Sequence, residues 1–305
     1  MIKLLKWLSV LSTIGMLFVL VGGALVTKTD SGLGCGKSWP LCEGEIIPST
    51  ITLELIIELS HRLVSGTVGI LVLALSILAW KYYGNVRETK FLAIMSIFFL
   101  VLQGLIGAAA VVWGQSDFVL AMHFGISLIS FAAVFLLMII IFEIDKKFDA
   151  NSLHIDSSLR KHFYALFTYT LAVVYTGALV RHTHASLACR GWPLCEPNVV
   201  FSPFSFEQWV QMAHRLAAGL LFVWVIYLFF RIIRDYKEHK IMYSGWTIAL
   251  LLMIFQVTLG AFIIMTMLNL SIALLHALII SIFFGLLCYF ILLSSRSAQN
   301  EKKSK

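Results

Sequence analysis

The chain has 305 residues, of which 60% are hydrophobic and only 13% are charged, and its mean hydropathy is +0.91. A soluble protein carries about 25% charged residues to cover its surface, so this composition excludes a soluble globular protein. Long apolar runs and only five cysteines also exclude a disordered chain, a collagen, a coiled coil and a small disulfide scaffold. The chain is therefore predicted to be an all-α, polytopic membrane protein.

Eight apolar runs are long enough to cross about 30 Å of hydrocarbon as helices. They are predicted near residues 7–27, 53–80, 92–113, 119–143, 162–180, 207–230, 243–266 and 270–293. The first run resembles a signal peptide, but it ends in GGALVTKTD without a small-x-small cleavage pattern, so we expect it to stay as a span. The tail SRSAQNEKKSK, residues 295–305, is expected to fray.

The formal net charge of +7 is explained by the membrane topology of the chain and does not indicate nucleic-acid binding. Of the 23 Lys and Arg residues, 17 lie at the N-terminus or in alternate connections, within 81–90, 146–161, 231–240 and 296–305. The positive-inside rule then places both termini in the cytoplasm and the cysteine-containing loops outside the cell membrane. No nucleic-acid partner is expected.

The two halves of the chain repeat one another. Gly23-Ala24-Leu25-Val26 recurs at 177–180, CGKSWPLC at 35–42 recurs as CRGWPLC at 189–195, and His61-Arg62 recurs as His214-Arg215. Gln103, Gly107 and His123 return as Gln256, Gly260 and His276, at an offset of 154 before the loop deletion and 153 after it. This register predicts two pseudo-symmetric four-helix bundles related by an axis along the membrane normal. The units are residues 1–145 and 162–305, joined by a cytoplasmic linker at 146–161.

The repeat also predicts how deep the histidines lie. Ser205-x-x-Gln208 is typical of a capping box that starts a helix, and Thr52 is its counterpart in the first half. His61 and His214 each follow these caps by nine residues, roughly 13 Å along a helix. His123 and His276 each follow a capping-type residue, Ser116 or Asn269, by seven positions. All four are therefore expected in the extracytoplasmic half, one pair per unit.

An ionisable residue inside a span is costly and indicates a functional site, although a histidine can also simply hydrogen-bond across helices. Two histidines duplicated in register favour metal ligation. Zinc would need a third repeated ligand, and a di-iron site would need a second Glu-x-x-His, whereas Glu58-x-x-His61 is repeated as Gln211-x-x-His214. Haem needs only one or two axial ligands, so the histidines are predicted to bind haem.

One pair of arginines and two pairs of cysteines accompany the histidines. Arg62 and Arg215 are candidates to bind haem propionates, the alternative being that they extend to the membrane interface. Cys35 with Cys42, and Cys189 with Cys195, are predicted to form disulfides outside the membrane around a shared Trp-Pro-Leu. A structural clamp is the simpler interpretation of these disulfides, and redox participation stays open.

The duplicated eight-span bundle, the Glu58-x-x-His61-Arg62 motif, the four matched histidines and the WPLC loops resemble the haem A synthase family, in its bacterial, cysteine-containing form. The resemblance covers essentially the whole chain. It implies oxidation of the C8 methyl group of haem O to the formyl group of haem A for terminal oxidases, through a hydroxymethyl stage with oxygen from water. It implies a haem b cofactor on His214 and His276, and the substrate haem between His61 and His123.

The residues add their own argument for this division. The halves match at ligands, arginines and cysteines but differ at Glu58 and Gln211. A carboxylate can stabilise developing positive charge or accept a proton from water, which an amide cannot do. Glu58 is therefore the candidate catalytic residue, the alternative being a structural hydrogen bond.

Two other functions fit the histidines. One is a dihaem b-type, quinol-linked cytochrome that only transfers electrons, and the other is a non-enzymatic haem carrier. Neither gives a role to Glu58. As partners, the resemblance implies haem O synthase (protohaem farnesyltransferase) and terminal oxidase assembly. A membrane electron acceptor is expected because no soluble domain could bind NAD or flavin, and a homo-oligomer stays open.

Overall fold

The structure is a computed structural model that describes residues 2–46, 48–114, 116–148, 150, 152–195 and 204–303. Most of these residues lie in helices and none lies in a β-strand, and eight of their helices are long and apolar enough to cross a membrane. The chain divides into two compact units, Met1–Phe142 and Glu143–Lys305. The predicted all-α fold with eight spans is confirmed.

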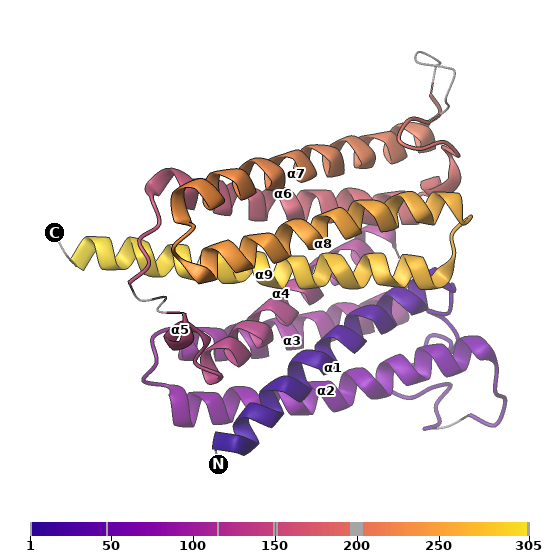
Figure 1. Cartoon of the computed structure of the whole chain (residues 1–305). Coiled ribbons are helices and arrows are strands. Elements are labelled where there is room, and N and C mark those ends of the chain that lie inside the picture. The colour runs from indigo at the N-terminus through magenta and orange to yellow at the C-terminus, as the bar shows by residue number, and fades with distance from the viewer. Residues whose placement is uncertain are drawn as a thin grey trace. The chain divides into compact units, whose positions relative to one another are not determined.

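Unit 1 is a bundle of four long helices that run side by side (Figure 1). They are α1 (Ile2–Lys28), α2 (Leu53–Tyr83), α3 (Thr89–Trp113) and α4 (Asp117–Ile141). Each helix packs against the next in the chain, and α4 packs against α1, which closes the bundle. The α1–α2 loop therefore lies at the same end of the bundle as the α3–α4 connection.

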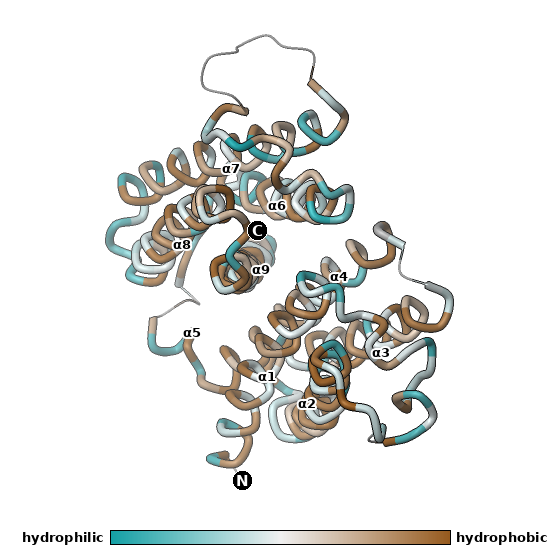
Figure 2. Tube along the Cα trace, turned by 90° about the vertical axis from the view of Figure 1, so that its right-hand side faces the viewer, coloured by the Kyte–Doolittle hydropathy of each residue, from teal (hydrophilic) through white to brown (hydrophobic). Residues whose placement is uncertain are grey.

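Unit 2 repeats this arrangement after the short helix α5 (Ile144–Lys147). Its long helices are α6 (Ser157–His182), α7 (Phe206–Tyr236), α8 (Lys240–Met265) and α9 (Leu270–Lys303), with the 3-10 turn η1 (Ala185–Leu187) after α6. Neighbours along the chain pack together, and α9 packs against α6. In both units the hydrophobic residues run along the helices and the hydrophilic residues gather toward their ends (Figure 2).

Side-chain caps fix where the helices that carry the four histidines begin. Thr52 accepts a hydrogen bond from the Leu55 N–H at 3.2 Å, and Ser205 forms the predicted capping box with Gln208. Ser116 caps α4 by accepting from the Val119 N–H at 3.3 Å, and the Asn269 side chain accepts from the Ile272 N–H at 3.3 Å. The four helix starts from which the histidine depths were counted are therefore confirmed.

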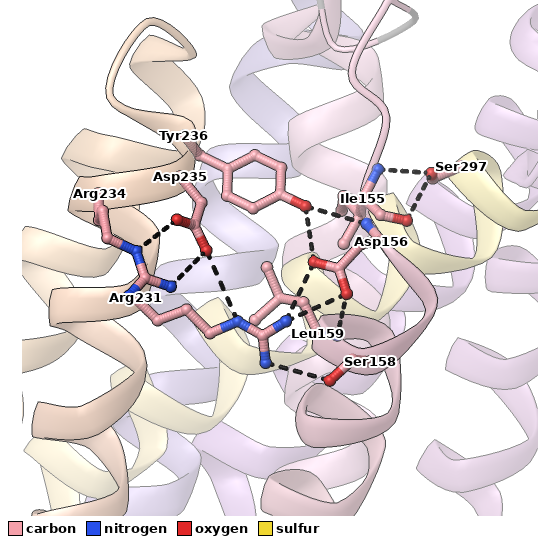
Figure 3. A network of polar contacts seen from close by, with 9 residues as sticks. All are labelled: Ile155, Asp156, Ser158, Leu159, Arg231, Arg234, Asp235, Tyr236 and Ser297. Atoms are coloured by element: carbon pink, nitrogen blue, oxygen red, sulfur yellow. Dashed lines mark hydrogen bonds and ion pairs between the residues drawn. The ribbon is translucent and has the colours of Figure 1, made fainter.

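The segment before α6 is tied to unit 2 by a polar network around Asp156 (Figure 3). The Asp156 carboxylate accepts from the Leu159 N–H at 2.9 Å, from Arg231 Nη2 at 3.1 Å and from the Tyr236 hydroxyl at 3.0 Å. The same hydroxyl accepts from the Asp156 N–H at 2.9 Å. Because Asp156 caps the helix, α6 begins at Ser157, five residues before the predicted start of its span.

The C-terminal tail does not fray as expected. Helix α9 continues to Lys303, and residues 304 and 305 lie outside the described residues. Ser297 is buried, and its hydroxyl accepts from the Ile155 N–H at 2.8 Å, while Glu301 pairs with Arg160 at 2.9 Å. The prediction of a frayed tail was wrong because it rested on the polar composition of the tail alone. That composition does not show that Ile155 and Arg160 bind the tail residues.

The network around Asp156 lowers the pKa of its carboxyl group. Burial opposes the charged carboxylate, but the hydrogen bonds from Leu159 and Tyr236 and the charge of Arg231 outweigh it and hold the pKa of Asp156 below its ordinary value. A carboxyl group whose pKa falls on folding stabilises the fold above its unfolded pKa, about 3.9. That stabilisation is lost as the pH falls through the lower, folded value.

Asp156→Ala should lower the free energy of unfolding by about 1 kcal/mol at pH 7, because the helix loses its N-cap. Asp156→Asn should lower the free energy of unfolding by less, because the amide oxygen of asparagine can still cap the start of α6. Thermal unfolding in detergent, followed by circular dichroism, measures both. The deficit of the Ala variant should shrink below about pH 4. Glu238→Ala, which removes a side chain that is 86% exposed, is the control, and an equal effect of the two Ala variants would contradict the assignment.

Candidate functional site

Each unit carries a disulfide-closed loop between its first two long helices. Cys35 is bonded to Cys42, and Cys189 is bonded to Cys195, as predicted. All four cysteines are at most 2% exposed, and in unit 1 the disulfide packs against Leu55 of α2. The loops are therefore closed caps that rest on the start of the second helix rather than free surface segments.

One buried side-chain oxygen holds the first cysteine of each loop. In unit 1, Glu58 Oε2 accepts from the Cys35 N–H at 2.7 Å, and in unit 2, Gln211 Oε1 accepts from the Cys189 N–H at 2.6 Å. Glu58 and Gln211 are both 3% exposed. The contact needs an acceptor but no charge, so the two halves share it although their residues differ.

The two predicted propionate arginines bind the loops. Arg62 Nη1 donates to the carbonyls of Ser38 and Leu41 at 2.9 and 3.0 Å. Arg215 makes the equivalent contacts in unit 2. Its Nη1 donates to the carbonyl oxygens of Gly191 at 2.7 Å, Pro193 at 3.2 Å and Leu194 at 3.2 Å. Its Nη2 donates to the carbonyl oxygen of Cys189 at 3.1 Å. Sequence reasoning missed these partners because backbone carbonyls carry no residue-specific signal. Propionate binding by either arginine stays a prediction.

The charges around these arginines differ between the units. Arg62 donates through Nε and Nη2 to Glu58 Oε1 at 3.1 and 2.5 Å, so its charge is paired inside the protein. Arg215 contacts carbonyl oxygens and the Met212 sulfur, and no described carboxylate lies within ion-pair distance of it. Among the described residues, the Arg62 guanidinium is therefore paired with a carboxylate in unit 1, and the Arg215 guanidinium in unit 2 is not.

Each predicted ligand histidine lies against a glycine of a neighbouring helix. The pairs are His61 with Gly23, His123 with Gly107, His214 with Gly177, and His276 with Gly260. A Cβ on these glycines would lie between 3.0 and 3.5 Å from the Cε1 atom of the ring, so the glycines allow the imidazoles to pack directly on helix backbone. Two glycine pairs that the repeat revealed thus have a physical reason, which the sequence alone did not show.

The structure pairs the histidines within each unit by topology. His61 and His123 are on α2 and α4, and His214 and His276 are on α7 and α9, in bundles where the helices pack in chain order and the last packs on the first. The two histidines of a pair therefore come from diagonally opposite helices.

This donor set fits a haem. Haem iron takes one or two imidazoles, and the described residues contain no group of three or more His, Cys, Asp and Glu that could hold a bare metal ion. Gln103 and Gln256 lie one turn before Gly107 and Gly260, and the buried Oε1 of each has no hydrogen-bond partner among the described residues. Nδ1 of His61 is likewise buried without a partner there. Unsatisfied polar atoms beside a ligand pair indicate a site built for a bound group.

Arg62→Ala should destabilise the protein far more than Arg215→Ala. Removing Arg62 leaves the buried Glu58 carboxylate without its counter-charge, which typically costs about 3–5 kcal/mol. Removing Arg215 leaves no described carboxylate without its counter-charge and breaks hydrogen bonds to carbonyls, each worth about 0.5–1.5 kcal/mol net, two of which are exposed and can bind water instead. Unfolding of the purified variants in detergent measures the difference.

The double variant Glu58→Gln/Arg62→Ala is the matched control for that experiment. Its glutamine keeps the acceptor for the Cys35 amide, as Gln211 does for Cys189, and removes the unpaired charge. It should therefore be more stable than Arg62→Ala alone. A double variant no more stable than the single one would show that charge pairing is not what Arg62 contributes.

Comparison with known proteins extends over nearly the whole chain. The sequence model of the COX15-CtaA family, described as cytochrome oxidase assembly protein, matches residues 6–288. The chain is 60% identical over 300 residues to a protein of Geobacillus kaustophilus named Heme A synthase, covering 98% of this chain and 94% of that protein. It is 56% identical over 302 residues to the Heme A synthase of Bacillus cereus, covering 99% and 97% of the two chains. It is 53% identical over 301 residues to that of Lysinibacillus sphaericus, covering 98% of each. The chain belongs to the COX15-CtaA family of cytochrome oxidase assembly proteins.

Proposed function

We propose that this protein is a haem A synthase, an oxidoreductase that converts the C8 methyl group of haem O to the formyl group of haem A. The observation that carries the proposal is the duplicated histidine pair seated on glycines, in a chain that matches proteins named Heme A synthase over nearly its full length. Methyl plus water gives hydroxymethyl, two protons and two electrons. Hydroxymethyl then gives formyl with the loss of two more protons and two electrons.

The two units take different roles in this proposal. Unit 2 holds the resident haem b between His214 and His276, and unit 1 holds the substrate haem between His61 and His123. When bound, haem b supplies one-electron transfer. The charge of Arg215 supports this division, because no carboxylate of the described residues pairs with it and it can bind the anionic propionates of a permanently bound haem, whereas the charge of Arg62 is paired with Glu58.

Glu58 is the group we assign to the chemistry itself. It lies three residues before His61 on α2, so both side chains project from one face of the helix. The Cys35 amide and Arg62 hold its two oxygens in fixed positions, so its charge needs no reorganisation during the reaction. In this role the carboxylate stabilises positive charge at the substrate methyl carbon or accepts a proton from the attacking water.

The proposed partners follow from the chemistry. Haem O comes from a haem O synthase (protohaem farnesyltransferase), haem A goes to a terminal oxidase under assembly, and the electrons leave through a membrane acceptor. Chromatography of the haems extracted from the purified protein tests the function. Haem O, a hydroxylated haem and haem A beside haem b support a synthase, whereas haem b alone would favour an electron-transfer cytochrome.

We place both termini in the cytoplasm and both cysteine loops outside, because the basic residues gather in alternate connections. After reduction, an impermeant thiol reagent added to intact cells should label Cys35, Cys42, Cys189 and Cys195. Labelling only from the cytoplasmic face would reverse the orientation.

The histidine pairs should differ in their mutant phenotypes. His214→Ala or His276→Ala should remove or disturb tightly bound haem b, because a bis-histidine haem needs both axial ligands. His61→Ala or His123→Ala should abolish haem A while most haem b stays bound. Absorption spectra and haem extraction measure both. Loss of haem b from the unit 1 variants alone would mean that the two roles are exchanged.

Glu58→Gln should fold, keep haem b and bind haem O, yet make little or no haem A. The variant copies Gln211, which shows that an amide can hold the loop cysteine in the same way. It loses one preorganised charge, which typically lowers a rate on the order of 10²–10³-fold. Glu54→Gln, an exposed position one turn earlier on α2, is the matched control. Near-normal haem A from Glu58→Gln would leave Glu58 a structural residue only.

A further inference from the structure

The first long helices of the two units differ at one position that faces a ligand histidine. Helix α1 reads Val19-Leu-Val-Gly22-Gly23, and α6 reads Val173-Val-Tyr-Thr176-Gly177. At the repeat offset of 154, Gly22 of unit 1 corresponds to Thr176 of unit 2. Both positions precede the glycines on which His61 and His214 lie.

In unit 2 the Thr176 hydroxyl lies between His214 and the helix backbone. Its Oγ1 is 2.9 Å from His214 Nδ1, and it donates to the Val173 carbonyl at 2.7 Å. A hydroxyl has one hydrogen, and a carbonyl can only accept, so that hydrogen is used. With the hydroxyl hydrogen donated to the Val173 carbonyl, Nδ1 is the donor to Oγ1. The neutral ring then carries its proton on Nδ1 and leaves the lone pair of Nε2 available to a metal.

In unit 1 the equivalent residue, Gly22, has no side chain. A Cβ on Gly22 would lie 3.0 Å from His61 Nδ1, so the position faces the corresponding nitrogen. That nitrogen is buried and has no hydrogen-bond partner among the described residues. No described residue therefore favours either tautomer of His61 through Nδ1 or holds the ring in one orientation at this nitrogen.

We propose that Thr176 is a positioning residue that makes His214 a permanent haem ligand, and that Gly22 leaves His61 as an exchangeable one. The proposal rests on the function proposed above, in that both histidines bind haem iron. A hydrogen bond to the second ring nitrogen fixes the tautomer and the orientation of a ligand histidine and strengthens it as a donor. A site for a permanent cofactor requires a strongly bound iron. A site that must release its product requires a more weakly binding histidine.

Thr176→Val removes the hydroxyl and keeps the shape of the side chain. Loss of such a contact typically weakens metal binding about 10- to 100-fold, so haem b should transfer to excess apomyoglobin faster by about that factor. The ferric low-spin electron paramagnetic resonance signal should shift, and the midpoint potential should rise, because a weaker imidazole donor stabilises ferric iron less. Thr176→Ser should restore all three properties.

Thr170→Val is the matched control for a merely structural effect. Thr170 is on the same helix, is fully buried, and donates to the Leu166 carbonyl at 2.7 Å without contacting a histidine. Its variant should leave haem transfer, spectrum and potential unchanged. Wild-type behaviour of Thr176→Val, or equal changes in the Thr170 and Thr176 variants, would overturn the proposal.

Gly22→Ser tests the same idea in the opposite direction. The new hydroxyl should hold His61 Nδ1 and slow the transfer of unit 1 haem to apomyoglobin about tenfold or more. Gly22→Ala adds the same Cβ, which pushes the ring by a few tenths of an ångström, but no hydroxyl, and should not slow the transfer. Equal transfer rates for the Ser and Ala variants would show that the hydroxyl has no such role.

His214→Ala separates a failure of this proposal from a failure of the proposed function. If His214→Ala loses haem b while Thr176→Val keeps it with an unchanged spectrum, the haem is where we place it and Thr176 has no positioning role. If His214→Ala keeps all of its haem with an unchanged spectrum, the placement of haem b itself is wrong.

Discussion

Polar groups inside a membrane-spanning bundle have no bulk water to bind, and this constraint governs both units. The imidazoles lie against glycines, where helix backbone can come close, and the loop amides and carbonyls bind one buried oxygen and one arginine. Each contact is made within a single four-helix unit. A unit can therefore present two histidines at a fixed depth because its own loop and helices satisfy the polar groups around them.

The duplication separates what the fold needs from what the chemistry needs. Both units keep the glycines, the disulfide, the acceptor for the cysteine amide and the arginine contacts with the loop carbonyls, so these contacts serve the scaffold. The units differ in a charge at Glu58 and in a hydroxyl at Thr176. Neither difference requires a change of backbone, because Gln211 keeps the amide contact and Gly22 keeps the helix. Differences of this kind can give one scaffold two haem sites of unequal behaviour.

Much of this could be predicted from the sequence, and the limits have physical causes. The spans follow from apolar length, the four caps from residue type, and the disulfides from duplicated short loops. The helical tail of α9 could not be predicted, because it is stabilised by Ile155 and Arg160, which are distant in sequence. The loop carbonyls that Arg62 and Arg215 bind are backbone atoms, which no sequence motif records. Thr176 was missed because comparing the two halves reveals residues that are identical in both. Thr176 matters because its counterpart in the first half is a different residue, Gly22.

The structure also changes the argument for Glu58. An acceptor at this position binds the cysteine amide in both units, so burial and hydrogen bonding at Glu58 do not by themselves indicate catalysis. The structural and catalytic interpretations are compatible, because the two oxygens have separate partners: Oε2 holds the Cys35 amide, and Oε1 binds Arg62. What unit 1 has and unit 2 lacks is the charge. Since Arg62 also binds the loop carbonyls, that charge is held between the disulfide loop and the ligand helix. A change of charge at Glu58 therefore acts on Arg62 and on the loop, so the catalytic role proposed for Glu58 would link the closed cap of unit 1 to the chemistry.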